Sequence, residues 1–303
     1  MPLTIRAALE QAISLLARHS PSAHADAEIL LGHTLGKPRH WPYIWGDKTI
    51  RTREQEQFQY RIIQRISGLP VAYLTGHRAF WSLDLSVTPD TLIPRPETEG
   101  LVETALGIIP KQAKWCIADL GTGAGPIALA IARERPNCQI IATDISTSAL
   151  AVAKQNAKRH KIENVIFRHG DWFAALAPHV INTSLEKSSK ETRHEQTFCE
   201  GYQIIVSNPP YVATEDPHLS HGDVRFEPRL ALLGGPEGLD AIRQIAHGAR
   251  KQLHPGSWLI LEHGFDQREQ IRTHLRELHY GEITTRRDYG GQERITLAKR
   301  GDS

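Results

Sequence analysis

The chain has 303 residues, of which 40% are hydrophobic and 23% charged, a composition typical of a globular protein with a sizeable core. Its 36 Lys and Arg against 34 Asp and Glu give a formal net charge of +2, which argues against bulk nucleic acid or an anionic membrane as the main partner. No stretch approaches the ~20 apolar residues that a membrane-spanning helix needs, and the first twenty residues lack the pattern of a cleavable leader.

The cysteines and histidines carry no recognisable site. Cys116, Cys138 and Cys199 are the only cysteines and none stands in a C-x-x-C pair, which predicts a reducing compartment and no disulfide. The 16 histidines occur without an H-E-x-x-H motif or a Cys/His cluster, so we predict no metal. We expect a cytoplasmic protein.

Residues 1–76 have a helical period and predict a small N-terminal bundle. Helices are expected near 5–16, 25–35 and 52–67, the second ending at Gly36. The apolar positions that define the first and third helices are Ile5, Leu9, Ile13 and Leu16, and Phe58, Ile62, Ile63 and Ile66. Such a bundle is expected either to dock a substrate or to cap the following domain.

The period changes to two in residues 77–93, where apolar and polar residues alternate from Phe80 to Val87. This alternation predicts a β-hairpin linker. The stretch LIPRPETE then begins the catalytic domain, residues 94–303, and Pro96 suits the first turn of a helix.

From residue 113 onward strands and helices alternate, which predicts a Rossmann-like α/β fold with a parallel sheet covered on both faces. Gly290-Gly291 marks a hairpin, so the C-terminal strand should run antiparallel. The expected strands are 115–119, 139–144, 165–169, 202–207, 257–262, 282–287 and 294–298, and the expected helices 126–134, 146–160, 240–253 and 267–279. Residues 181–201 are polar and predict a mobile insertion.

A glycine-rich loop follows the first of these strands in the sequence DLGTGAGP. Gly121, Gly123 and Gly125 let the backbone approach a ligand, and Asp144, ending the next strand, can accept both hydroxyl hydrogens of a ribose. The loop lacks the dinucleotide spacing G-x-G-x-x-G, and Pro126 has no N–H to offer a phosphate, so an adenosine bearing a sulfonium fits better.

Two further groups complete this predicted cofactor site. Asp119 could balance the positive charge of a sulfonium. Asp171 and Trp172, after the third strand, offer a polar group and an aromatic edge to an adenine, and this role is favoured over that of an ordinary turn residue for Asp171.

The fourth strand ends in the sequence SNPPY. If the cofactor donates a methyl group, the side-chain oxygen of Asn208 and the carbonyl of Pro209 can accept the two hydrogens of an acceptor –NH₂ and aim its lone pair. Pro210 stiffens the turn, and the ring of Tyr211 offers a flat surface on which a planar amide or base can stack. In isolation, Pro-Pro would only end a strand.

The chain resembles the protein-(glutamine-N5) methyltransferases of the HemK type. The motifs that carry the resemblance are DLGTGAG, Asp144, GDWF, SNPPY, LIPRPETE and GDVRFEPRLAL. The likeness covers nearly the whole chain except 181–201, and within the group it is greatest to the enzymes that modify peptide chain release factors. Ala124 stands where Ser or Thr is more usual, Pro126 where a small or aliphatic residue is, and Ala79 where an acid is common.

The resemblance implies a substrate, the glutamine of the Gly-Gly-Gln motif in bacterial class 1 release factors, and a monomeric enzyme that contacts neither nucleic acid nor membrane. It implies that S-adenosylmethionine is bound, and S-adenosylhomocysteine released, by Gly121, Thr122, Gly123, Ala124, Gly125, Asp144, Asp171, Trp172 and Asn208. The substrate-binding and catalytic residues implied are Asn208, Pro209, Pro210 and Tyr211.

Several alternatives remain at this point. The nearest alternative is a glutamine methyltransferase for a ribosomal protein, over which RPETE favours an enzyme for release factors. An adenine-N6 DNA methyltransferase shares N-P-P-Y, but no target-recognition domain or sustained basic face is apparent. The glycine spacing disfavours a nicotinamide-dependent oxidoreductase, and the intact motifs disfavour a non-catalytic binding module.

Overall fold

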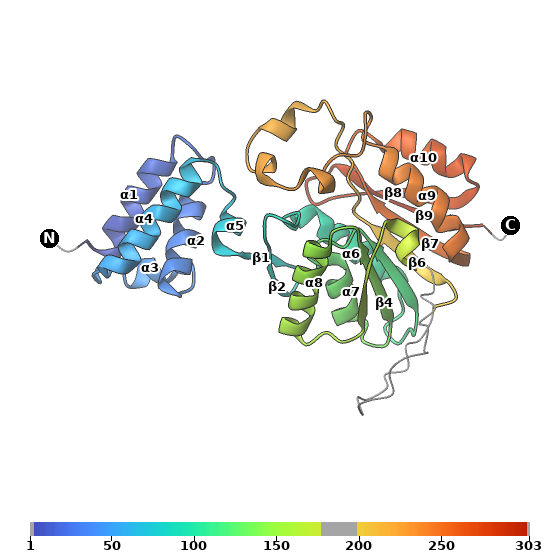
Figure 1. Cartoon of the computed structure of the whole chain (residues 1–303), viewed down its shortest axis with the longest axis horizontal. Helices are drawn as coiled ribbons and strands as arrows, with labels where there is room; N and C mark the ends of the chain where they lie inside the picture. Colours follow the sequence, from blue (N-terminus) through green and yellow to red (C-terminus); the bar gives the residue numbers. More distant parts are fainter. Residues whose placement is uncertain (1–2, 177–198, 302–303) are drawn as a thin grey trace, which may run out of the picture. The chain divides into compact units, whose positions relative to one another are not determined.

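The computed structural model describes residues 3–176 and 199–301 (Figure 1). The chain divides into two compact units. Unit 1 contains the chain up to Arg78 together with Ser86–Pro89 and Pro217–Glu227, and unit 2 contains Ala79–Leu85, Asp90–Asp216 and the chain from Pro228 onward.

Unit 1 is helical, as its sequence period predicts. The Thr4 side chain accepts a hydrogen bond from the Ala7 N–H at the start of the first helix, and Gly36 ends the second with a left-handed φ of 61°. Its helices are α1 (Ile5–Leu16), α2 (Ala23–Leu35), α3 (Trp41–Ile44), α4 (Thr52–Ile66) and α5 (Val71–Thr75).

The core of unit 1 forms between α1, α2 and α4, where Leu16, Leu30 and Phe58 are buried. One residue of the predicted apolar stripe is wrong: Ile63 is 64% exposed, whereas its neighbour Ile62 is buried. Adjacent residues on a helix point about 100° apart, so both cannot face a core that contacts only one side of α4.

A buried charge cluster joins the late segment Pro217–Glu227 to the helices of unit 1. Arg65 lies 2.7 Å from Asp26 and also 2.7 Å from Asp223, and its side chain is 8% exposed. Arg65 and Asp26 form a buried ion pair, and the partly exposed Asp223 adds a second carboxylate that ties the segment to α4. The segment contains the short 3-10 helices η3 (Pro217–Ser220) and η4 (Val224–Phe226).

Unit 2 is built on a seven-stranded sheet in the order β5-β4-β3-β6-β7-β9-β8. Its strands are β3 (Cys116–Leu120), β4 (Gln139–Asp144), β5 (Val165–His169), β6 (Tyr202–Ser207), β7 (Leu253–Glu262), β8 (Tyr280–Arg287) and β9 (Glu293–Arg300). The strand β9 runs antiparallel to both of its neighbours, β7 and β8, which confirms the predicted C-terminal hairpin. The expected hairpin before the sheet is also present, as β1 (His77–Phe80) and β2 (Leu83–Ser86).

Helices cover both faces of this sheet, so successive strand residues enter different cores (Figure 1). Ile204 and Val206 pack under α6, α7 and α8, whereas Ile205 packs under α9 and α10. The elements are η1 (Pro96–Thr98), α6 (Glu99–Ile108), α7 (Pro126–Glu134), α8 (Thr147–His160), η2 (Trp172–Leu176), η5 (Arg229–Ala231), α9 (Asp240–Gln252) and α10 (Arg268–Glu277). The predicted Rossmann-like class is confirmed.

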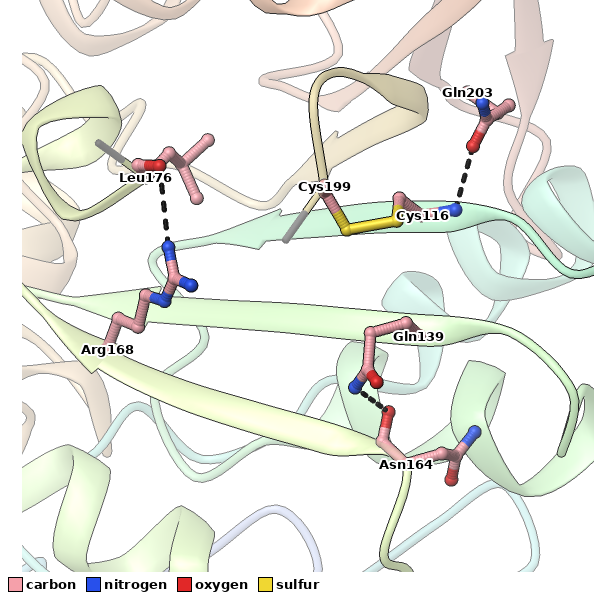
Figure 2. The surroundings of a disulfide bond; sticks show 7 residues. All are labelled: Cys116, Gln139, Asn164, Arg168, Leu176, Cys199 and Gln203. Carbon is pink, nitrogen blue, oxygen red and sulfur yellow. Dashed lines mark hydrogen bonds between the residues drawn. A yellow bond between two sulfur atoms is a disulfide. The ribbon is translucent and has the colours of Figure 1, made fainter. Parts of the chain in front are cut away.

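The expectation of no disulfide is wrong, because Cys116 and Cys199 are joined (Figure 2). Cys116 begins β3 and Cys199 lies just ahead of β6, and the two strands are neighbours in the sheet although 83 residues separate the cysteines. No local spacing could reveal this pair, since the sheet order brings them together. Cys138, the free cysteine among the described residues, is buried.

The predicted insertion 181–201 lies almost wholly outside the described residues, which resume at Cys199. On its near side, Leu176 is buried and its carbonyl accepts a hydrogen bond from Arg168 of β5, and on its far side Cys199 is bonded to β3 (Figure 2).

No helix in the described ranges is long and apolar enough to cross a membrane. Likewise, within residues 3–176 and 199–301, no three His, Cys, Asp or Glu side chains gather where they could hold a metal ion.

Candidate active site

The site residues meet at the edge where the parallel strands end, which we call the carboxyl edge. Leu120, the last residue of β3, pairs with Ser207, the last residue of β6, and the Ser207 hydroxyl donates to the Leu120 carbonyl at 2.7 Å. Gly121 and Asn208 are the next residues of the two strands. The glycine loop and the Asn-Pro-Pro-Tyr motif therefore begin side by side, at the point where the strand order reverses.

The glycine loop turns sharply because its three glycines have left-handed φ angles, 73° at Gly121, 56° at Gly123 and 89° at Gly125. The N–H groups of Gly121 and Thr122 both donate to the Thr143 carbonyl of β4, which fixes the loop against the sheet. A Cβ on Gly123 would meet nothing within 4 Å. The backbone of the loop is thus exposed on one side to open space.

Asp144 ends β4 and faces this loop. Its Oδ2 accepts the N–H of Gly123 and its Oδ1 that of Ser146, both at 2.8 Å. Burial raises the pKa of the Asp144 carboxyl, against the effect of these hydrogen bonds. Each oxygen of a carboxylate has a second acceptor position, so both can still receive a ligand hydroxyl.

Asp119, on β3, is fully buried beneath the loop. Its Oδ2 accepts from the Thr122 hydroxyl at 2.6 Å and from the Ala128 N–H at 3.2 Å, whereas its Oδ1 has no hydrogen-bond partner among the described residues. Burial raises the pKa of this carboxyl to about 7, which the two hydrogen bonds oppose. A buried acceptor without a partner is costly and calls for a donor or a cation.

The remaining residues of the predicted cofactor site lie around the loop. Trp172 begins η2, and its ring lies close to Gly121: a Cβ added to this glycine would be 3.3 Å from the ring. The neighbouring Asp171 is exposed. Ala124 is buried, and its carbonyl accepts a hydrogen bond from Asn156 of α8 at 2.9 Å. The loop is therefore held from both α8 and η2.

Asn208 is held by a residue that our reading of the sequence did not place in the site. Its Nδ2 donates to the hydroxyl oxygen of Thr98 at 3.1 Å, so its Oδ1 is turned away from that contact. Thr98 belongs to η1 and is buried. Thr98 belongs to the LIPRPETE motif, in which the sequence indicates a helix start at Pro96 and no separate role for the threonine.

Tyr211 is fixed through both its backbone and its hydroxyl. The Gln267 side chain donates to its carbonyl at 2.9 Å, and a Cβ on Gly238 would come within 2.2 Å of the same oxygen. The hydroxyl lies 3.4 Å from Glu262 Oε1, and burial together with this carboxylate raises the pKa of the tyrosine. The proline carbonyl of Pro210 is likewise closely packed, against Gly234.

Sequence reasoning thus missed Thr98, Glu262 and Gln267. One signal was available: Glu262 ends a run of apolar residues on a buried parallel strand, and acidic residues at such ends often serve a site. Pro209 lies between Asn208 and the packed Pro210, and it is buried.

This geometry, with a switch point at β3 and β6, a glycine loop and an antiparallel β9, defines a Rossmann-like methyltransferase. Residues 112–220 match the model of a methyltransferase domain, and residues 7–76 match that of the PrmC N-terminal domain. The solved delta-N METTL16 MTase domain has the same fold, with a TM-score of 0.51 and 17% identity over 73% of this chain and 90% of its own.

Curated relatives identify the family within this class. A release factor glutamine methyltransferase of Xylella fastidiosa is 45% identical over 90% of this chain and 92% of its own. One of Salmonella typhimurium is 44% identical over 96% of this chain and 97% of its own. The chain belongs to the release factor glutamine methyltransferase family and is an enzyme.

Proposed function

We propose that this enzyme transfers a methyl group from S-adenosylmethionine to the side-chain amide nitrogen of the glutamine in the Gly-Gly-Gln motif of bacterial class 1 release factors. The observation that carries the proposal is the junction of the glycine loop and Asn-Pro-Pro-Tyr at paired strand ends, Leu120 and Ser207. A methyl donor and an amide acceptor need this proximity for in-line transfer.

The residues of the loop fit S-adenosylmethionine, which when bound supplies an electrophilic methyl group on a positively charged sulfur. The unpartnered Oδ1 of Asp119 offers negative charge next to the loop. Asp144 would hold the ribose hydroxyls through its remaining acceptor positions, and Trp172 the adenine. The open side of Gly123 leaves room for the ligand against the backbone.

The acceptor amide would be held by the motif after β6. An amide nitrogen is a poor nucleophile because its lone pair is delocalised, so orientation is the main contribution of the protein. Asn208 Oδ1 and the Pro209 carbonyl would each accept one N–H of the glutamine, while the Tyr211 ring lies against its plane. The proton leaves after transfer and needs no strong base.

Unit 1 would dock the protein substrate. A groove between α1 and α4 is lined by apolar side chains, among which Leu15 is 57% and Ile63 is 64% exposed. Exposed apolar side chains around one groove are typical of protein contacts. Ile63→Asp should raise KM for an intact release factor and leave KM for a short Gly-Gly-Gln peptide unchanged. Leu230→Asp, at an equally exposed residue of unit 2, is the control.

We place the enzyme in the cytoplasm because its proposed substrate acts in translation. We further propose that it is a monomer and needs no metal. The Cys116–Cys199 disulfide runs against that location, since disulfides are rare in reducing compartments. Thiol titration of the denatured protein without reductant tests whether Cys116 and Cys199 are bonded.

Mass spectrometry of a release factor incubated with the enzyme and S-adenosylmethionine tests the proposed function. A mass gain of one methyl group on the Gly-Gly-Gln peptide is expected, and its absence would refute the assignment. A methyl group found instead on a ribosomal protein or on adenine in DNA would identify one of the rival activities.

Asn208→Ala tests the division of roles within the site. We expect a loss of turnover of roughly 10²-fold or more, because the amide loses a hydrogen-bond acceptor that orients it. Calorimetry should find the affinity for S-adenosylhomocysteine nearly unchanged. Preserved turnover with weakened cofactor binding would reverse our assignment of Asn208.

A further inference from the structure

The two functional side chains of the Asn-Pro-Pro-Tyr motif share one buried anchor. Tyr211 donates its hydroxyl hydrogen to Glu262 Oε1 at 3.4 Å, and Asn208 Nδ2 donates to Thr98 Oγ1 at 3.1 Å. Thr98 in turn donates its hydroxyl hydrogen to Glu262. Both chains of hydrogen bonds therefore end on the same carboxyl group.

The direction of the bonds follows from the chemistry of each group. Above about pH 7 Glu262 is ionised and can only accept, so Thr98 gives its single hydrogen to Glu262 and keeps its lone pairs for an incoming donor. The only donor of an asparagine side chain is its –NH₂ group. Asn208 must therefore turn Nδ2 toward Thr98, which leaves Oδ1 directed elsewhere.

The anchor is rigid because it is buried and comes from different elements. Glu262, the last residue of β7, is 1% exposed, and Thr98 of η1 is 2% exposed. Burial raises the pKa of Glu262 to about 7, and the nearby charge of Glu97 adds to this, while Arg294 opposes it. Glu262 Oε2 has no hydrogen-bond partner among the described residues, so Tyr211 and Thr98 are the hydrogen-bond donors that the structure gives this carboxyl.

We propose that Thr98 and Glu262 are positioning residues that set the orientation of the Asn208 carboxamide, so that Oδ1 rather than Nδ2 meets the acceptor amide of the substrate. An amide flipped by 180° would place two N–H donors against the N–H donors of the glutamine and could not hold it. The identity of the acceptor amide rests on the proposed function, whereas the orientation of the Asn208 carboxamide rests on its hydrogen bond to Thr98.

Thr98→Val is the test variant, since valine has nearly the shape of threonine and lacks the hydroxyl. We expect kcat to fall roughly 10²-fold, with KM and the affinity for S-adenosylhomocysteine unchanged. Thr98→Ser keeps the hydroxyl and should restore most of kcat. Thr104→Val is the matched control: Thr104 is also buried, on α6, and its hydroxyl donates to the Gly100 carbonyl of the same helix.

A second measurement needs no substrate. In ¹⁵N-asparagine-labelled protein, the side-chain amide signals that vanish in Asn208→Ala belong to Asn208. We expect their hydrogen exchange with solvent to be faster in Thr98→Val and in Glu262→Gln than in the wild type and in Thr104→Val. Faster exchange of the Asn208 side-chain amide in Thr98→Val and Glu262→Gln, but not in Thr104→Val, supports the inference.

The outcomes separate the two proposals. Wild-type enzyme that fails to methylate the release factor refutes the proposed function, and the exchange rates then decide the orientation alone. Unchanged exchange in Thr98→Val, or a kcat loss that Thr98→Ser does not recover, overturns the positioning role. A fall in melting temperature equal for Thr98→Val and Thr104→Val with no difference in kcat also overturns it.

Discussion

The buried carboxyl of Asp119 makes the stability of the ligand-free enzyme depend on pH in a specific direction. Its pKa is about 7 in the folded protein, against 3.8 for an exposed aspartate. Between these two values the folded state holds a proton that the unfolded state has released. Stability therefore falls as pH rises through this window and becomes level above about pH 7.

The magnitude follows from the width of the window. Each unit of pKa difference corresponds to about 1.4 kcal/mol, so between about pH 5 and pH 8 the folded state loses close to 3 kcal/mol from this group. In Asp119→Asn the residue no longer titrates. We expect the decrease in the free energy of unfolding between pH 5 and pH 8 to be smaller in Asp119→Asn than in the wild type, by about 3 kcal/mol.

Urea unfolding followed by circular dichroism at the two pH values gives both free energies. Glu262, with its pKa of about 7, and His263, with a lowered pKa, are not among the groups that shift the pKa of Asp119, so we expect their contributions to cancel in the difference. Parallel pH dependence in wild type and variant would refute the argument that Asp119 is protonated in the folded, ligand-free state.

Two further predictions concern backbone packing and the disulfide. Gly238→Ala should lower stability by about 1–3 kcal/mol and reduce kcat, because the added Cβ would come within 2.2 Å of the Tyr211 carbonyl and the residue has a φ of 75°. In the control Gly107→Ala the Cβ would meet nothing within 4 Å, so stability should be unchanged or higher. Equal unfolding midpoints for the two variants would contradict this prediction. Denatured protein kept free of reductant should titrate as one thiol of its three cysteines, and Cys116→Ser should cost about 2–4 kcal/mol of stability; three thiols without reductant would mean that Cys116 and Cys199 are unbonded.

Most helices and strands were predictable because their signals are local. The helix 126–134 and the strands 139–144, 165–169 and 202–207 were placed to the residue, since an apolar run bounded by Gly, Pro or a capping residue leaves little freedom. The sequence predicted that this strand begins at 257, because His254 to Gly256 carry no apolar pattern, whereas β7 begins at Leu253. The side of α4 that faces the core was decided by packing, as the exposed Ile63 shows.

The sequence by itself determined the chemistry of this protein: the glycine loop, Asp144 and Asn-Pro-Pro-Tyr are short motifs whose residue types suffice to indicate a methyl donor and an amide acceptor. Only the tertiary structure decided which distant residues meet. The pairing of Cys116 with Cys199, and the contact of Asn208 with Thr98 from 110 residues away, depend on sheet order and helix placement. Such contacts form because burial leaves polar groups no partner but each other, and no local pattern records that constraint.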